Sequence, residues 1–206
     1  GNGHHDARGH QALEDIAVMR AVPNMTVIVP ADAVETEQAV FRAAEHYGPV
    51  YIRLGRPGVP VIYDENYRFE IGKAHLLRPG RHVGLVATGI MVAIALEAAD
   101  LLAKEGIETA VLNMSTIKPL DKEAVIELAR ATGALVTAEE HTVIGGLGSA
   151  VAEAVAENYP VPVLRVGVED CFGQSGTPAE LLAAYGLTKE NIAQKAKEAM
   201  ARKGAK

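Results

Sequence analysis

Several residue types are scarce or absent in this chain, and each scarcity excludes a class of protein. The 206 residues include a single cysteine, Cys171, and no tryptophan, so no internal disulfide can form and a reducing, cytoplasmic setting fits best. No run of about 18 apolar residues is present to span a bilayer. A net charge of -6 gives no basic field for a phosphate backbone or an acidic membrane surface. We therefore expect neither nucleic acid nor a membrane among its partners.

What is present is typical of a globular protein with a sizeable core, since 49% of the residues are apolar and 22% are charged. The first residues, Gly1 to His5, include no methionine and do not form a charged-then-apolar leader. We therefore expect a fragment or a processed product.

Short continuous apolar runs such as Val27-Ile28-Val29 alternate with longer helical periods. This pattern predicts parallel strands that are buried on both faces and connected by helices, that is, an α/β fold. In the first part of the chain it predicts helix 12–21, strand 25–29, helix 33–47 and strand 50–54, with Asp32 as a helix N-cap and Glu35 three residues later. Residues 1–60 form one unit, and the glycines, prolines and polar residues that follow predict a linker over 61–70.

Residues 71–206 predict a doubly wound α/β/α domain of about five strands. The expected strands are 71–77, 83–87, 108–113, 134–138 and 161–168, and the expected helices are 91–105, 122–132, 147–158, 178–184 and 189–202. The segment Thr177-Pro178-Ala179-Glu180 combines an N-cap, a proline in the first turn and a capping-box glutamate. This domain can stand alone, whereas the two strands of residues 1–60 cannot, because independent sheets need three or more strands. We expect the missing part of that sheet upstream or in a partner.

Three segments carry candidate chemistry. Asp6 and His10 precede a helix, where a loop either presents a carboxylate and an imidazole to a pocket or is simply polar. His4, His5 and His10 lack the paired ligand spacing of a metal site, so no metal ligand is predicted. Arg53 and Arg56 follow a parallel strand, where guanidinium groups bind phosphate or carboxylate, or else form surface ion pairs.

The third segment is Glu139-Glu140-His141 followed by Gly145-Gly146-Leu147-Gly148, between a strand and a helix. Either its amides cradle an anion at the helix N-terminus, or its glycines let the helix pack closely while the acids and His141 face a domain interface. Cys171 has no base beside it and is predicted to be an inert thiol.

Taken together, these segments resemble the C-terminal half of transketolases, especially the forms split into two polypeptides. The likeness runs from about Asp6 to the last helix. The matching phrases are His10 to Ala17, Val22 to Met25, Pro30 to Asp32, Gly48 to Leu54, Ala87 to Gly89, Lys118 to Asp121, Ala138 to His141 and, with Gln174 in place of the family's glutamate, Phe172 to Gly176.

This resemblance implies transfer of a two-carbon ketol unit from a ketose phosphate to an aldose phosphate, as in the pentose phosphate pathway, with thiamine diphosphate and a divalent cation (Mg) as cofactors. By motif, Asp6 and His10 contact the hydroxyl groups of the sugar, His10 also assists proton movement, and Arg56 binds the sugar phosphate. The family's loop reads Glu-Asp-Gly-x-Thr/Ser-His-Gln, so its glycine and hydroxyl residue are replaced here by Ala7 and Gly9.

The family's cofactor-binding residues lie upstream of this loop and on an N-terminal portion, so none can be named in this chain. We expect an N-terminal transketolase subunit or domain as partner, a homodimer, and an inactive isolated chain. An alternative is a non-catalytic assembly module of a related enzyme, such as a deoxyxylulose-phosphate synthase or a protein like the beta chain of pyruvate dehydrogenase. This alternative is based on helix 91–105, which is apolar nearly all round, as an interface helix would be. A small-ligand sensor at Gly145 to Gly148 is a third reading.

Overall fold

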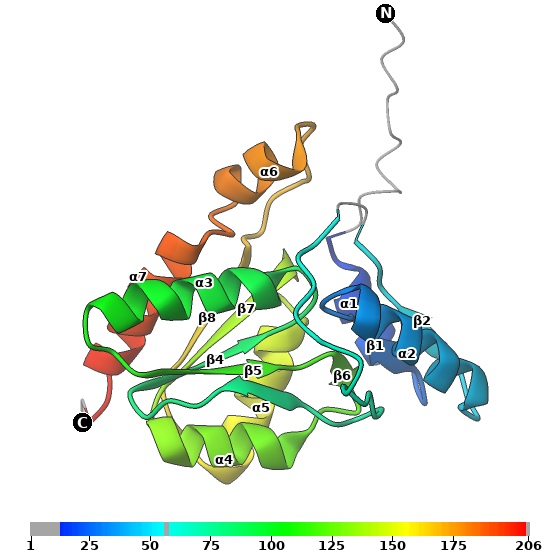
Figure 1. The fold of residues 1–206 in the computed structure, drawn as a ribbon, viewed down its shortest axis with the longest axis horizontal. Helices are drawn as coiled ribbons and strands as arrows, with labels where there is room; N and C mark the ends of the chain where they lie inside the picture. Colours follow the sequence, from blue (N-terminus) through cyan, green and yellow to red (C-terminus); the bar gives the residue numbers. More distant parts are fainter. Residues whose placement is uncertain (1–12, 56–57, 205–206) are drawn as a thin grey trace, which may run out of the picture.

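The computed structural model describes residues 13–55 and 58–204 of the chain (Figure 1). Its helices are α1 (Asp15–Ala21), α2 (Ala33–Glu45), α3 (Met91–Lys104), α4 (Lys122–Thr132), α5 (Leu147–Asn158), α6 (Pro178–Ala184) and α7 (Lys189–Ala201). Its strands are β1 (Thr26–Ile28), β2 (Val50–Ile52), β3 (His75–Arg78), β4 (Val83–Ala87), β5 (Thr109–Asn113), β6 (Thr116–Lys118), β7 (Leu135–Thr142) and β8 (Val163–Val168). The α/β class is confirmed, and β4, α4, α5 and α6 have the predicted bounds.

Five strands form the larger sheet in the order β3-β5-β4-β7-β8. The last four run parallel to one another, and β3 pairs antiparallel with β5. All five residues of β4 and of β5 are buried, which is why these strands read as continuous apolar runs in the sequence. The predicted count of about five strands is confirmed. The antiparallel direction of β3 was not predicted.

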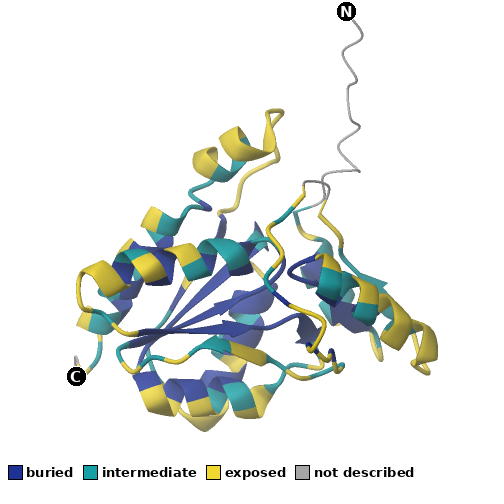
Figure 2. Cartoon of the chain, in the orientation of Figure 1, coloured by how far each residue is buried: buried dark blue, intermediate teal, exposed yellow. Residues whose placement is uncertain are grey.

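Helices cover both faces of this sheet, with α3 and α7 on one side and α4 and α5 on the other (Figure 1). Each face has its own apolar cluster, which the strands share with the helices above it. Figure 2 shows strands β4, β5 and β7 as the buried centre of this unit. The buried side of α3, from Met91 to Leu102, packs within its own chain, and Glu97 and Asp100 face outward. Six residues of α3 are therefore buried within this chain, which accounts for part of its apolar composition.

A second, smaller sheet has the order β2-β1-β6. Strands β1 and β2 are parallel, as predicted, with Thr26 opposite Val50. The third strand, β6, is antiparallel to β1 and comes from the second half of the chain, only two residues after β5. Sequence reasoning missed β6 because three residues in a connection carry no periodicity. The sheet that seemed to lack a strand thus receives one from residues 116–118.

The segment that was predicted to be a linker is packed against α2. Tyr63, Tyr67 and Phe69 are buried, and the rings of Tyr63 and Tyr67 stack with their centroids 3.7 Å apart. Asp32 is the predicted N-cap of α2, since its Oδ1 accepts the Glu35 N–H at 2.8 Å. Its Oδ2 accepts the backbone N–H groups of residues 62 and 63. One carboxylate therefore both caps the helix and holds residues 61–70 beside it. This segment is called the strap below.

A buried polar cluster joins this strap to the larger sheet. The Glu35 carboxylate is fully buried and accepts hydrogen bonds from the Tyr67 hydroxyl at 2.5 Å and from the Asn113 amide at 3.0 Å. The same amide donates to the Tyr63 hydroxyl at 2.8 Å. Burial, followed by the neighbouring Glu35 charge, raises the pKa of both tyrosines, so both remain hydroxyl donors or acceptors at physiological pH.

Helix α6 differs from the others because it projects from the body and has no buried residue (Figures 1 and 2). Its predicted capping box is present, with Thr177 and Glu180 bonded reciprocally. None of the helices in the described part of the chain combines the length and the apolarity needed to cross a membrane.

Candidate functional site

The three residues that motif resemblance assigns to substrate, Asp6, His10 and Arg56, lie outside the described residues. Their predicted roles stay predictions. The structure does describe the elements that flank them, namely α1, which begins at Asp15, and β2, which ends at Ile52. Of the other candidates, Arg53 and the whole segment from Glu139 to Gly148 are described.

Arg53 follows β2 directly, and two acids bind its guanidinium. Its Nε lies 3.0 Å from Asp15 Oδ2 and its Nη1 lies 3.2 Å from Glu140 Oε2. The Tyr51 hydroxyl donates to the same Asp15 oxygen at 2.7 Å. Because Asp15 is on α1 and Glu140 is on β7, Arg53 joins the two sheets through one side chain. The ion-pair interpretation of Arg53 is therefore confirmed, although the pair is largely buried rather than on the surface.

Burial, together with the hydrogen bond to Asp15, raises the pKa of Tyr51 to about 12. The hydroxyl thus keeps its proton and donates to the carboxylate at all ordinary pH values. The other carboxylate oxygen, Asp15 Oδ1, is buried and has no hydrogen-bond donor among the described residues. Sequence reasoning did not single out Asp15, because a carboxylate in the first turn of a helix is commonplace and its partners are 36 and 38 residues away.

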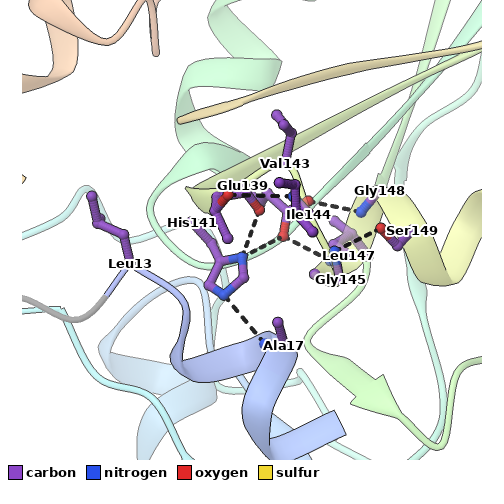
Figure 3. Close-up of polar contacts among 12 residues, drawn as sticks. Leu13, Ala17, Glu139, His141, Val143, Ile144, Gly145, Leu147, Gly148 and Ser149 are labelled. Atoms are coloured by element: carbon purple, nitrogen blue, oxygen red, sulfur yellow. Dashed lines mark hydrogen bonds and ion pairs between the residues drawn. The ribbon is translucent and has the colours of Figure 1, made fainter. Parts of the chain in front are cut away.

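The segment from Glu139 to Gly148 comprises the end of β7, the turn over residues 143–146 and the start of α5 (Figure 3). The Glu139 carboxylate turns back onto the first residues of α5 and accepts the N–H groups of Leu147 at 2.7 Å and Gly148 at 2.8 Å. The Gly145 N–H donates to Ser149 Oγ at 2.9 Å. These amides form the anion cradle in the first of the two interpretations that the sequence allows. Since Glu139 already occupies those of Leu147 and Gly148, the structure does not support an anion cradle or a ligand sensor here.

Gly146 is required by this arrangement. A Cβ at this position would lie 2.0 Å from Glu139 Oε2 and 2.7 Å from His141 Nδ1, far inside contact distance. At Gly145, which has φ of +78°, a Cβ would meet the Cβ of Ala17 at 2.7 Å. The alternative interpretation, in which glycines permit close packing, is therefore the one that the geometry supports.

His141 faces the interface between the two parts of the chain, as that interpretation expects. Its ring is fully buried, and its Nε2 accepts the N–H of Ala17 on α1 at 3.2 Å (Figure 3). Nε2 therefore carries no proton, and the Nδ1–H donates to the Thr142 carbonyl at 2.7 Å. The structure thus assigns a neutral imidazole with its proton on Nδ1.

The electrostatics of Glu139 and His141 follow from their burial. Removal from water raises the pKa of Glu139 to about 7, against the lowering effect of the Gly148 and Leu147 amides. Burial also lowers the pKa of His141, partly offset by the Thr142 carbonyl and Asp15. Glu139 Oε2 and His141 Nδ1 are 3.6 Å apart. Both groups therefore favour their neutral forms more than they do in water.

Two further predictions concern metal binding and the cysteine. Within residues 13–55 and 58–204, no group of three or more His, Cys, Asp or Glu side chains is arranged to hold a metal ion. The histidines near the N-terminus lie outside this range. Cys171 is exposed, and so is its neighbour Phe172.

The fold and this site define a class of protein with two parts. One part is an α/β/α unit, and the other is a segment with the parallel strands β1 and β2. Polar contacts at the carboxyl ends of β2 and β7 hold the two parts together. Two family descriptions match the chain, "Transketolase, pyrimidine binding domain" over residues 1–61 and "Transketolase, C-terminal domain" over residues 72–192. The chain belongs to the transketolase family.

Known relatives agree with this assignment. The chain is 51% identical over 194 residues to the 6-deoxy-6-sulfo-D-fructose transketolase subunit SqwH of Clostridium sp. (strain MSTE9), covering 94% of this chain and 60% of the relative. It is 42% identical over 190 residues to an apulose-4-phosphate transketolase subunit of Phocaeicola vulgatus, covering 92% and 61%. A solved structure described as a split gene transketolase, inactive beta4 tetramer, superposes with a TM-score of 0.93 at 55% identity, covering 95% of this chain and 64% of that one. The chain thus spans about three fifths of the length of these relatives.

Proposed function

We propose that this chain is the C-terminal portion of a transketolase that transfers a two-carbon ketol unit from a ketose phosphate to an aldose phosphate, and that it is inactive alone. The observation that carries this proposal is the interlocking of the two matched domains. Strand β6 completes the sheet of β1 and β2, and Arg53 and His141 bind across the same boundary. The segment that bears the candidate substrate residues is thereby joined to a rigid scaffold, as a binding site requires.

Within this proposal, His10 moves protons at the sugar hydroxyl groups, because an imidazole exchanges protons near neutral pH. Asp6 orients the hydroxyl groups as a hydrogen-bond acceptor, and Arg56 pairs with the sugar phosphate through its guanidinium. Arg53 has a different role from Arg56: its own guanidinium is already occupied by Asp15 and Glu140, so it supports the end of β2.

The cofactor in this proposal is thiamine diphosphate with Mg²⁺, which supplies the carbon nucleophile that takes up the ketol unit. The described residues do not provide a donor set for the cation, so no residue of this chain is assigned to the cofactor or its metal. We infer that an N-terminal transketolase subunit or domain binds them and that the working assembly contains at least two copies of this chain. A reducing, cytoplasmic setting suits its single exposed thiol.

The experiment compares the 206-residue chain alone with its whole gene product mixed with an N-terminal transketolase subunit, each with thiamine diphosphate and Mg²⁺. Turnover of xylulose 5-phosphate with ribose 5-phosphate is expected only from the mixture. Because two relatives are described by other sugars, the donors include 6-deoxy-6-sulfofructose and apulose 4-phosphate. Turnover by the isolated chain would contradict its inactivity, and absence of transfer with every donor would contradict the function.

Two substitutions in the active mixture test the assigned residues. His10→Ala is expected to lower kcat about 100-fold or more, in the range for loss of a general acid or base. Arg56→Gln is expected to raise the KM for the sugar phosphate about ten- to a hundredfold, from loss of charge-assisted hydrogen bonds. The matched control is Arg42→Gln, which removes an exposed ion pair with Glu45 and should change neither constant.

A further inference from the structure

Helix α1 begins without a cap of its own. The first N–H groups of a helix have no partner within it and need an acceptor from elsewhere. Glu14, at the N-cap position, makes no side-chain capping bond, and its carboxylate instead accepts the Leu13 N–H at 2.8 Å. The third residue of the helix, Ala17, donates to His141 Nε2 at 3.2 Å. The cap of α1 therefore comes from a residue 124 positions away, on the other domain.

The same domain fixes both ends of α1. At the start, the Thr142 N–H donates to the Leu13 carbonyl at 2.7 Å. At the end, Lys118 Nζ donates to the carbonyls of Arg20 at 2.9 Å and Val22 at 2.6 Å. Arg20 Nη1 in turn donates to the Gly145 carbonyl at 2.6 Å. Since α1 has only seven residues, too few to be stable alone, these contacts decide where it lies.

The imidazole serves as a cap only while Nε2 carries no proton. A proton there would set one donor against another, the Ala17 N–H, and would place a positive charge beside the partial positive charge of the helix N-terminus. The Glu14 carbonyl offsets only part of this cost. Burial lowers the pKa of His141, and Arg53 acts in the same direction, whereas Asp15 and the Thr142 and Glu14 carbonyls oppose it. The charged groups on the elements around the ring are Glu139 and Glu140 on β7, Asp15 and Arg20 on α1, Arg53 after β2, Glu153 on α5 and Arg165 on β8.

We propose that neutral His141 is a positioning residue that caps α1 across the domain boundary, and that protonation of its Nε2 breaks this cap and loosens the first turn of α1, while the other contacts of the helix with the C-terminal domain remain. The consequence for catalysis rests on the proposed function: α1 follows the predicted substrate residues Asp6 and His10 by a few positions, so loosening its first turn weakens sugar binding. The inference predicts acid-dependent loss of substrate affinity with little change in the overall fold.

Two variants separate the contacts of the ring. In His141→Gln, the side-chain oxygen stands near the position of Nε2 and still accepts the Ala17 N–H. In His141→Asn, the amide reaches only the position of Nδ1, so the bond to the Thr142 carbonyl remains and the cap is lost. Neither variant can titrate. Both replacements remove the ring, the Asn side chain being one methylene group shorter than that of Gln, and they differ in which hydrogen bond survives.

The first measurement is amide hydrogen exchange of this chain, expressed as protection factors so that the intrinsic effect of pH is removed. At pH 8 the Ala17 amide should lose about five- to tenfold of its protection in His141→Asn, the equivalent of one hydrogen bond, and retain it in His141→Gln. Between pH 8 and 4.5 the wild type should lose protection at Ala17 while His141→Gln does not. The Leu85 amide in the buried strand β4 serves as the control for global opening. Equal protection in the wild type and the Asn variant, or equal acid loss in the wild type and the Gln variant, overturns the proposal.

The second measurement uses the active mixture described above. His141→Asn should raise the KM for the sugar phosphate more than it lowers kcat, and His141→Gln should restore the KM and flatten its rise at acid pH. If kcat and KM change equally in both variants, the positioning role is wrong. If the wild-type mixture transfers no ketol unit, the proposed function fails, and hydrogen exchange still decides whether His141 caps α1.

Discussion

Replacement of Gly146 by alanine tests the geometry of the turn between β7 and α5. Gly146 has φ of −83°, which any residue adopts, so the cost of a side chain here is steric rather than a matter of backbone strain. The added Cβ would lie 2.0 Å from Glu139 Oε2, so the carboxylate must move by more than about 1 Å to reach ordinary contact distance. Such a shift breaks its bonds to the Leu147 and Gly148 amides, which are 2.7 and 2.8 Å long.

At pH 8, above the raised pKa of Glu139, each bond to its carboxylate contributes about 1.5 to 3 kcal/mol, and partial relaxation recovers some of this. We expect Gly146→Ala to lower the free energy of unfolding by about 3 to 5 kcal/mol, and the melting temperature by about 6 to 20 °C for a chain of this size. Urea unfolding followed by circular dichroism provides the measurement.

The matched control is Gly58→Ala, because a Cβ at Gly58 meets nothing within 4 Å. This variant should lie within about 0.5 kcal/mol of the wild type. In a Glu139→Ala background the cost of Gly146→Ala should shrink, since the obstructing carboxylate is gone. A Gly146→Ala protein as stable as the Gly58→Ala protein would refute the proposed packing of the turn.

Two further predictions concern the buried charges. Arg53→Met should lower the free energy of unfolding by about 2 to 4 kcal/mol, because it leaves the largely buried Asp15 carboxylate without its cation. The control Arg42→Met, which breaks an exposed pair, should lower it by less than about 0.5 kcal/mol. Similar losses in both variants would contradict the structural role of Arg53. Glu139→Gln should be less stable than the wild type at pH 5, because the hydroxyl oxygen of neutral Glu139 can still accept one of the two backbone N–H groups, whereas the amide nitrogen of Gln cannot accept. Because the folded pKa of Glu139 is raised to about 7, the stability that its neutral form contributes is complete below about pH 4.5 and lost as the pH rises through 7. The difference in free energy of unfolding between the wild type and Glu139→Gln should therefore narrow toward pH 8. Unfolding curves at pH 5, 6.5 and 8 provide the measurement. A difference that widens with pH would show that the carboxylate stays ionised.

The contribution of β6 has a consequence for how the two matched domains behave. Val29 at the end of β1 donates to the Ser115 carbonyl at 2.7 Å, and the Thr88 hydroxyl donates to the Val29 carbonyl at 3.2 Å. With Arg53 and His141, these contacts cross the boundary at several points. The short first segment therefore depends on the second for its order, which agrees with the expectation that its two strands are insufficient by themselves.

Local patterns in the sequence determined the elements of the larger sheet and their helices. The continuous apolar run of β4 and the periodicity of α4 and α5 carry enough signal over 5 to 12 residues to set their bounds. Helix caps at Asp32 and Thr177 were predictable for the same reason, because their partners are three residues away. The family phrases around His10, Arg53 and His141 likewise lie in single short segments.

Only the tertiary structure decided which of these segments meet. The ion pairs of Arg53 join residues that are separated by up to 125 positions in the chain, Asp15 and Glu140. Nothing in the local sequence pairs these residues. They meet because the fold brings the ends of β2 and β7 together. The same is true of His141 as a cap for Ala17, and of β6 as a third strand for β1. Periodicity records what a residue does with its neighbours three or four positions away. Contacts between distant segments depend on packing of the whole chain. The sequence therefore left open whether the amides of Leu147 and Gly148 bind an anion, and the fold shows that both donate to Glu139.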